Sequence, residues 1–145
     1  MRASAQTSEE RVAREIAHDR AIAPHAEATW NWASPSGRAR ATRRAGCFAD
    51  ALDAAPGLRA LELGCGSGVF LERALATRAR VTGLDVSAEL LAEARQRASV
   101  RARASLTIGD AERLPFSGGA FDVVYGSSIL HHLRLEIALA EMRRV

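Results

Sequence analysis

The stretch Ala60-Leu61-Glu62-Leu63-Gly64-Cys65-Gly66-Ser67-Gly68-Val69-Phe70 decides the fold of this chain. It begins with an apolar run, continues with three glycines at alternate positions, and then passes into helical spacing. Because glycine adopts positive φ and carries no side chain, such a turn bends sharply and leaves room for a ligand against the main chain. The stretch therefore predicts a buried strand, a ligand-binding glycine turn and the start of a helix.

The spacing of the glycines separates two classes of ligand. Dinucleotide-binding turns follow G-x-G-x-x-G and place a pyrophosphate on the helix N-terminus. Here the third glycine position of that pattern is Val69, and the carboxylate of Glu62 would repel a pyrophosphate. An acid ahead of G-x-G-x-G suits a ligand that carries an ammonium, such as an amino-acid moiety. A nicotinamide-dependent dehydrogenase is therefore the less favoured alternative.

Composition limits the class of protein. The chain has 145 residues, of which 48% are hydrophobic, which suits one domain, or part of one, with its own core. Its net charge is +3, and its basic residues are interspersed with acids, so no nucleic-acid partner is indicated. Neither a signal peptide nor an apolar run of the roughly 18 residues typical of a membrane span is present, and we expect a cytoplasmic protein with no membrane partner. Cys47 and Cys65 have no metal-ligand spacing, so no metal site is expected.

The order of elements indicates an α/β fold. A capping-box pattern, Thr7 with Glu10, begins a helix that ends near Pro24, and Ser36 is expected to cap a second helix. Strands and helices then alternate, which predicts a parallel, doubly wound sheet covered on both faces. We expect an N-terminal helical cap over residues 1–56 and a partial ligand-binding domain over residues 57–145. The strands are expected at 58–63, 80–85, 105–108 and 121–125, and the later helices at 67–77, from Ser87, and at the C-terminal end with Leu135, Leu139, Met142 and Val145 on one face.

Acidic residues lie at or near the ends of the first three predicted strands. They are Glu62, Asp85 and Asp110, and strand four ends at Tyr125-Gly126-Ser127. In such sheets the ligand lies at the carboxyl ends of the strands, near the change in strand order. Asp85 also follows the first glycine at close to the roughly 20 residues expected of an acid that binds ribose hydroxyls. We therefore expect these side chains to surround one ligand.

Several segments in order resemble the class I S-adenosylmethionine-dependent methyltransferases. Besides the glycine turn they are Gly83-Leu84-Asp85-Val86-Ser87, Gly109-Asp110-Ala111-Glu112-Arg113-Leu114-Pro115-Phe116, Phe121-Asp122-Val123-Val124 and Ile129-Leu130-His131-His132-Leu133. The resemblance covers residues 58–145, and the Leu-Pro-Phe and Leu-His-His-Leu segments look most like the small-molecule branch called type 11. It implies the first four strands, in the order 3-2-1-4, of a seven-stranded Rossmann-like sheet, with S-adenosylmethionine as cofactor and a small-molecule methyl acceptor.

The resemblance assigns a role to each matching position. Gly64 and Gly66, with Cys65 and Gly68 in the same turn, would line the methionine end of the donor, and Glu62 would support its ammonium. Asp85 would bind the ribose, and Val86 would pack on the adenine. Asp110 would lie near the adenine amino group and Ala111 would donate its N–H to the ring, while Ser127 would lie beneath the methionine moiety.

Three further features have both a structural and a functional interpretation. Trp30 lies where this family places a lid, and an aromatic face can stabilise a sulfonium, although packing of the N-terminal helices explains it as well. His131 is a weak candidate for a base near the acceptor, or a structural histidine. The arginine cluster (Arg38, Arg40, Arg43 and Arg44) is either a solvated helix face or a contact for an anionic substrate.

The later strands of the family are missing from the sequence. A sheet of order 3-2-1-4 would leave strand four as an apolar edge open to another chain. We therefore expect either a truncated reading frame or self-association through this strand. The favoured function is a methyltransferase acting on a small molecule, and the alternative is an inactive S-adenosylmethionine-binding remnant or an interaction module.

Overall fold

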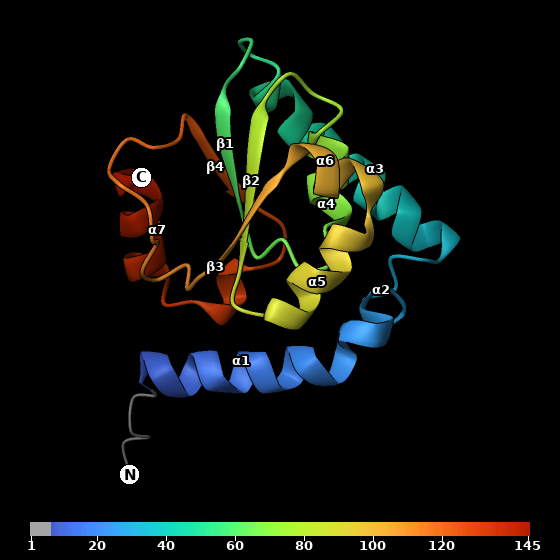
Figure 1. Ribbon diagram of the computed structural model, residues 1–145, viewed down its shortest axis with the longest axis vertical. Helices are drawn as coiled ribbons and strands as arrows, with labels where there is room; N and C mark the ends of the chain where they lie inside the picture. Colours follow the sequence, from blue (N-terminus) through green and yellow to red (C-terminus); the bar gives the residue numbers. More distant parts are fainter. Residues whose placement is uncertain (1–6) are drawn as a thin grey trace.

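The fold is built on one parallel sheet. The structure, a computed structural model, describes residues 7–145, so the first six residues of the predicted 1–56 cap lie outside the described part. Within that part, four strands pair in the order β3-β2-β1-β4 (Figure 1). This order confirms the predicted Rossmann-like parallel arrangement. The strands are β1 Arg59–Leu63, β2 Arg80–Asp85, β3 Ser105–Ile108 and β4 Val123–Gly126.

The register brings the carboxyl ends of the strands together. Leu63 at the end of β1 pairs with Leu84 of β2 and with Gly126 of β4. The N–H of Gly64 donates to the carbonyl of Leu84 over 2.8 Å, which ties the start of the glycine turn to the neighbouring strand. The turn, the end of β2 and the end of β4 therefore lie side by side.

Helices flank the sheet on two sides (Figure 1). On the right of the view lie the helices that cover one face, and α7 lies alone on the left. None of the helices in residues 7–145 combines the length and apolar character needed to cross a membrane. The helices are α1 Ser8–Ile22, η1 Ala23–His25, α2 Ala26–Thr29, α3 Pro35–Leu52, α4 Val69–Ala74, α5 Ala88–Gln96, α6 Ala98–Arg103, η2 Leu130–His132 and α7 Leu135–Arg144.

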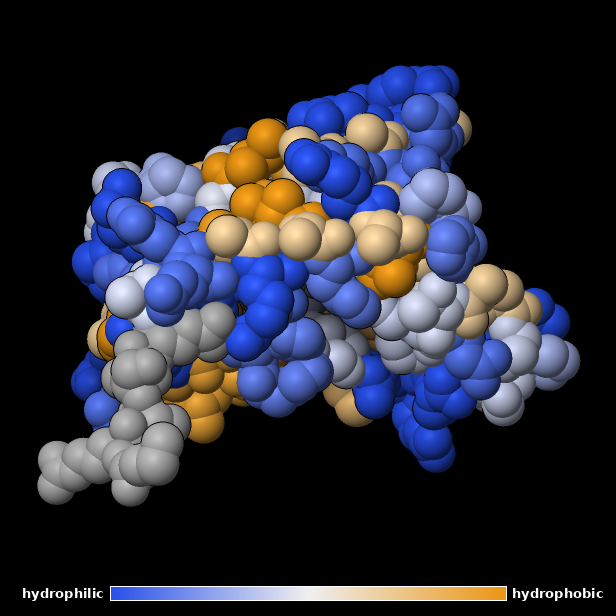
Figure 2. All heavy atoms as spheres, turned by 90° about the horizontal axis from the view of Figure 1, so that it is seen from below, coloured by the Kyte–Doolittle hydropathy of each residue, from blue (hydrophilic) through white to orange (hydrophobic). Residues whose placement is uncertain are grey.

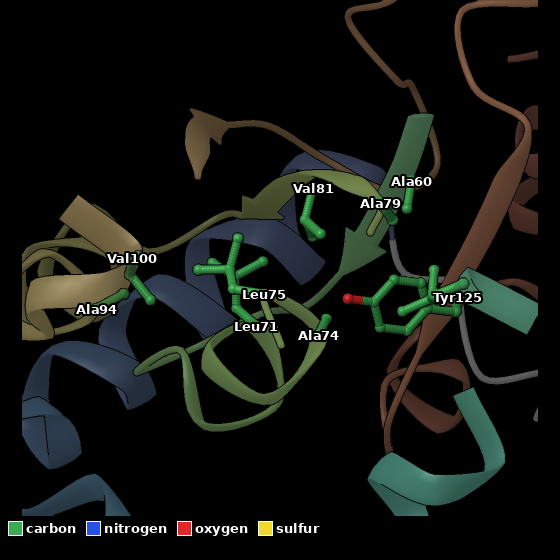
Figure 3. Packing of buried hydrophobic residues seen from close by; sticks show 10 residues of the cluster. Ala60, Leu71, Ala74, Leu75, Ala79, Val81, Ala94, Val100 and Tyr125 are labelled. Carbon is green, nitrogen blue, oxygen red and sulfur yellow. The ribbon is translucent and has the colours of Figure 1, made fainter. Parts of the chain in front are cut away.

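Alternation along β1 divides the core between the two faces. Ala60 belongs to the larger buried cluster, to which α4, α5 and α6 contribute, while Leu61 and Leu63 belong to a second cluster with residues of α7. Figure 3 shows residues of the larger cluster from the strands and helices facing one another. Both faces of the sheet are thus covered, as near-continuous apolar parallel strands require.

Helix α1 crosses below the carboxyl ends of the strands (Figure 1). It begins with the predicted capping box, in which the Thr7 hydroxyl accepts from the N–H of Glu10 and the Glu10 carboxylate accepts from the N–H of Thr7. Figure 2 shows the molecule from this side, where hydrophilic residues surround a band of apolar ones. Helix α1 therefore covers the carboxyl ends of the strands, where the ligand is expected.

Two helix starts differ from the sequence prediction, and one helix was not predicted. Ser34, not Ser36, caps α3, because Pro35 fits the first helical position, where its missing N–H costs nothing. Helix α4 begins two residues later than predicted, since Gly68 still has a φ of +81°. The predicted helix after Ser87 is followed by a separate helix, α6, because the backbone of Arg97 is extended.

The buried face of α7 also differs from the prediction. Leu135 and Leu139 are exposed, at 50% and 51% of their surface, and it is Ala138 that is fully buried. Met142 and Val145 pack in the second core cluster as expected. Only half of the predicted apolar face therefore contacts the sheet.

Two glycines of α3 provide a matched test of its packing. A Cβ at Gly37 would lie 1.7 Å from the carbonyl oxygen of Asn31, whereas a Cβ at Gly46 would have no heavy atom within 4 Å. We expect Gly37→Ala to lower the free energy of unfolding by about 2 kcal/mol or more, because the backbone must shift. Gly46→Ala should instead raise it by about 0.5–1 kcal/mol, since alanine favours a helix interior. Urea unfolding of both variants checks this, and equal changes would contradict the packing described.

Candidate functional site

A cavity of about 420 Å³ lies between the carboxyl ends of the strands and α1. This volume falls within the range of about 300–1,000 Å³ that is usual for small-molecule sites. Residues from the glycine turn, the ends of β2 and β4, the loop after β3, and the helices α1 and α3 line it. Its polar and charged lining residues are Arg11, Glu15, His18, Asp19, Arg40, Arg44, Ser67, Asp85, Asp110, Ser127, Ser128, His131 and His132.

The glycine turn forms one wall of the cavity. Gly64 and Gly66 have φ values of +64° and +50°, a conformation that side chains rarely adopt. A Cβ on Gly66 would come within 3.3 Å of the Trp30 ring, so the indole lies directly above the turn. Gly68 is not among the lining residues: it caps α4, and a Cβ there would face Ala94 at 3.1 Å. The turn thus exposes its backbone to a ligand beneath an aromatic side chain.

Asp85 connects the glycine turn to the end of β2. One carboxylate oxygen accepts from the N–H of Gly66 over 2.8 Å, and the other accepts from the N–H of Ser87 over 2.9 Å. Burial raises the pKa of Asp85, and these backbone hydrogen bonds oppose the rise. Each oxygen retains a further lone pair, so the carboxylate can still accept from a ligand hydroxyl.

Asp110 is held by an arginine from α1. The Arg11 guanidinium lies 2.5 Å from one oxygen of Asp110, and its Nε lies 3.2 Å from Glu112. Arg11 is buried, and the Glu112 side chain is 2% exposed and also pairs with Arg134. The segment around Asp110 and the N-terminal helix are therefore joined by a buried network of charges.

The polar face of α1 that lines the cavity was not predicted from the sequence. Arg11, Glu15 and Asp19 recur every four residues and so lie on one side of the helix, and all three line the cavity. This spacing is the signal that could have found them. Burial, together with the charges of Asp85 and Glu15, raises the pKa of Asp19 to about 6. Glu15 also lies 3.2 Å from Nδ1 of His132.

Glu62 lies behind the glycine turn and not among the lining residues. It is 1% exposed, and its carboxylate accepts a hydrogen bond of 3.0 Å from the Tyr125 hydroxyl. Burial raises the pKa of Glu62 to about 8, although the Tyr125 hydrogen bond opposes the rise. Its assignment to the donor's ammonium stays a prediction.

The raised pKa of Glu62 predicts a pH dependence of stability. The group ionises near 4.5 in the unfolded chain and near 8 in the folded one, so the stability it contributes is complete below about pH 4.5 and is lost as the pH rises through about 8. Glutamine at position 62 has nearly the same shape as glutamate and cannot ionise. We therefore expect Glu62→Gln to raise the free energy of unfolding more at pH 8 than at pH 5, measured by urea unfolding. The exposed Glu93→Gln is the control, and a pH-independent effect of Glu62→Gln would contradict this account.

The other end of the cavity is positively charged. Two arginines of α3, Arg40 and Arg44, have their guanidinium carbons 5.3 and 5.4 Å from the centroid of the Trp32 ring. Arg44 also donates to the hydroxyls of Ser127 and Ser128, over 3.2 and 2.7 Å, just after β4. The cavity therefore has carboxylates at the ends of β2 and β3 and guanidinium groups beside the end of β4.

Most of the predicted site residues meet in this cavity. The residues that line it are Trp30, Gly64, Cys65, Gly66, Asp85, Val86, Asp110, Ala111, Ser127 and His131, and Glu62 and Gly68 do not. Burial raises the pKa of the Cys65 thiol well above its usual range, so this residue is a small neutral spacer. The His131 ring lies 3.9 Å from that of His132, centroid to centroid.

The lining also fits the cofactor that the sequence implies. Ser67 lines the cavity, and its hydroxyl is buried with no hydrogen-bond partner among residues 7–145. A buried hydroxyl without a partner is costly, and a polar ligand would supply one. The lining matches a nucleoside joined to an amino acid. Its acidic groups can accept from hydroxyls, its aromatic ring can stabilise a cation, and the glycine backbone leaves room for the ligand.

Comparison with known proteins agrees with this reading. The family model described as a methyltransferase domain matches residues 60–145. A 37.1 kDa protein of transposon Tn4556 from Streptomyces fradiae is 40% identical over 100 residues, covering 66% of this chain and 29% of its own length. A malonyl-[acyl-carrier protein] O-methyltransferase from Legionella pneumophila is 34% identical over 90 residues, covering 60% of this chain and 32% of its own length. The chain thus spans about a third of the length of these relatives.

The fold comparison extends over nearly the whole chain. Phosphoethanolamine N-methyltransferase 1 from Haemonchus contortus, solved with phosphoethanolamine and S-adenosylhomocysteine, superposes with a TM-score of 0.73. The match covers 96% of this chain and 30% of that one, at 19% identity, and so speaks for the fold alone. The matched model does not test the narrower resemblance to the type 11 branch, which stays a prediction. From the family match and the shared sheet, the chain belongs to the methyltransferase domain family of class I S-adenosylmethionine-dependent enzymes.

Proposed function

We propose that this chain binds S-adenosylmethionine in the cavity and that the protein transfers the methyl group to a small-molecule acceptor. The observation that carries the proposal is the convergence at Asp85. Its carboxylate is held at the glycine turn by the N–H of Gly66, and it faces the same cavity as Asp110. A turn open to a ligand and two acids at the neighbouring strand ends support a bound nucleoside.

Each end of the donor has candidate partners. At the adenosine end, Asp85 would accept from the ribose hydroxyls, Val86 would pack on the adenine, and Asp110 with Ala111 would bind its polar edge. At the methionine end, Gly64 and Gly66 would leave room for the amino acid beside Ser127. Trp30 lies above Gly66, where its ring can stabilise the sulfonium.

The main task of the protein in methyl transfer is to align the donor with the acceptor. S-adenosylmethionine, when bound, supplies a methyl group on a sulfonium that is already activated for displacement. The chain's own residues hold the donor at the glycine turn and exclude water by covering it with α1 and Trp30. A base is needed only when the acceptor retains its proton, and His131, which lines the cavity, is the candidate for this role.

Calorimetry tests the proposal. S-adenosylmethionine and S-adenosylhomocysteine should each bind with a stoichiometry of one, and NAD should not bind, because Val69 replaces the third glycine. Transfer of radiolabel from methyl-labelled S-adenosylmethionine to small molecules of a cell extract would then demonstrate turnover. Binding without turnover would favour the alternative of an inactive remnant or interaction module. Binding of NAD in place of both donors would contradict the proposal.

Three further expectations belong to this proposal. We keep the division into an N-terminal cap over residues 1–56 and a ligand-binding part over 57–145, and we place the protein in the cytoplasm. Self-association through β4 is also proposed, because β4 pairs with β1 on one side and lies at an edge of the described sheet. Sedimentation that gives a monomer at all concentrations would exclude it.

A further inference from the structure

Two positive charges on α3 face the cavity from the same side of the helix. Arg40 and Arg44 are one turn apart, and both guanidinium groups lie over the Trp32 ring, 5.3 and 5.4 Å from its centroid. Both residues are half-buried and line the cavity. Like charges at this spacing destabilise a helix, so a negatively charged group bound between the two arginines would be stabilising.

No carboxylate in residues 7–145 forms an ion pair with either arginine. Arg44 donates to the neutral hydroxyls of Ser127 and Ser128, and the recorded contact of Arg40 is the aromatic ring. Two other arginines of the described chain that are at least partly buried do have acidic partners, Arg11 with Asp110 and Arg97 with Glu27 and Glu72, whereas Arg73 donates to the Thr42 hydroxyl. The cavity thus holds two guanidinium groups whose remaining donors are available to a ligand.

The rest of the cavity does not neutralise this end. Its acidic lining residues (Glu15, Asp19, Asp85 and Asp110) come from α1 and from the ends of β2 and β3. The arginines instead lie beside the residues that follow β4, where the proposed function puts the methionine end of the donor. That end brings a sulfonium, an ammonium and one carboxylate. The donor therefore adds more positive than negative charge to a positive region.

We propose that the methyl acceptor is an anion whose carboxylate or phosphate group binds at the Arg40–Arg44 pair. The inference rests on the proposed function and names the class of its acceptor. The planar guanidinium fork suits both oxyanions, and stacking on Trp32 holds the two side chains in place before the acceptor arrives. An anion here offsets both the repulsion between the arginines and the surplus charge of the donor.

The test separates the acceptor's anion from the donor's own carboxylate. The protein is first saturated with S-adenosylhomocysteine, and inorganic phosphate and malonate are then titrated in separate calorimetric experiments. At least one anion should bind, and Arg40→Gln or Arg44→Gln should weaken it by about 10-fold or more, as expected when a charged hydrogen bond is lost. Arg43→Gln is the matched control: it removes the same charge from the exposed side of α3, outside the cavity lining.

Each outcome bears on the proposal. Tighter binding of phosphate than of malonate supports a phosphorylated acceptor, and the reverse order supports a carboxylate. The proposal is overturned if neither anion binds the saturated protein, if the anions merely compete with S-adenosylhomocysteine, or if Arg43→Gln weakens binding as much as the other variants. Absence of S-adenosylhomocysteine binding would instead count against the proposed function. The same anion titrations on the ligand-free protein would then still decide whether the pair binds an anion, and thermal melts verify that each variant is folded.

Discussion

Asp85→Asn should weaken S-adenosylmethionine binding by about 100-fold or more. Hydrogen bonds to a charged group contribute about 1.5–3 kcal/mol each, and a ribose offers two hydroxyls to this carboxylate. The amide also cannot accept from both N–H groups that the carboxylate now holds, those of Gly66 and Ser87. The glycine turn would therefore lose one of its supports as well as a ligand contact. Calorimetric titration of the variant measures the loss.

Asp50→Asn is the matched control for this variant. Asp50 is exposed on α3 and does not line the cavity, so the same change of charge should leave donor affinity as it is. Thermal melts of both variants separate loss of fold from loss of contact. A folded Asp85→Asn variant that binds the donor as tightly as the wild-type chain would contradict the role assigned to Asp85.

Arg11→Ala should release α1 from the cavity and destabilise the protein by about 3 kcal/mol. Removing one partner of a buried ion pair leaves an uncompensated charge, which typically costs about 3–5 kcal/mol. Here Glu112 keeps Arg134 as a partner, so the lower end of this range applies, while Asp110 loses its recorded cationic partner. Urea unfolding measures the change in stability.

Hydrogen exchange locates the effect of Arg11→Ala. The amides of α1 should exchange faster, and the amides of β1 and β2 should change less. Arg20→Ala is the control, because Arg20 joins α1 to Glu89 at the exposed surface and should have a much smaller effect. Equal exchange of α1 in the two variants would show that the Asp110 network does not hold the helix.

Much of the fold could be predicted because it depends on local patterns. Apolar strands that alternate with helices specify a parallel sheet, and the glycine turn identifies β1 as the strand before the ligand. Once the strand order was expected, the carboxyl ends of β1, β2 and β3 followed, and with them the meeting of Gly66, Asp85 and Asp110 at one cavity. The capping box at Thr7 could also be predicted, because its two hydrogen bonds lie within four residues.

The remaining features depend on contacts between segments far apart in the chain. The pairing of Arg11 with Asp110 spans 99 residues, and nothing in the local sequence of α1 specifies which face meets the strand ends. The position of Glu62 is a second case: its carboxylate accepts from the hydroxyl of Tyr125, 63 residues further along the chain, and does not line the cavity. For α7, Leu135 and Leu139 fit a helical stripe, yet both are exposed, and it is Met142 with Val145 that packs against residues of the sheet.

The central claim is that the glycine turn and the ends of β2 and β3 form one donor site. Backbone NMR of a labelled sample, titrated with S-adenosylhomocysteine, tests this most directly. A single donor site predicts that the largest amide shifts fall on Gly64, Gly66, Val86 and Ala111, while Gly118 and Gly119, which do not line the cavity, do not move. Shifts confined to residues outside the cavity, or no shifts at saturating ligand, would contradict it.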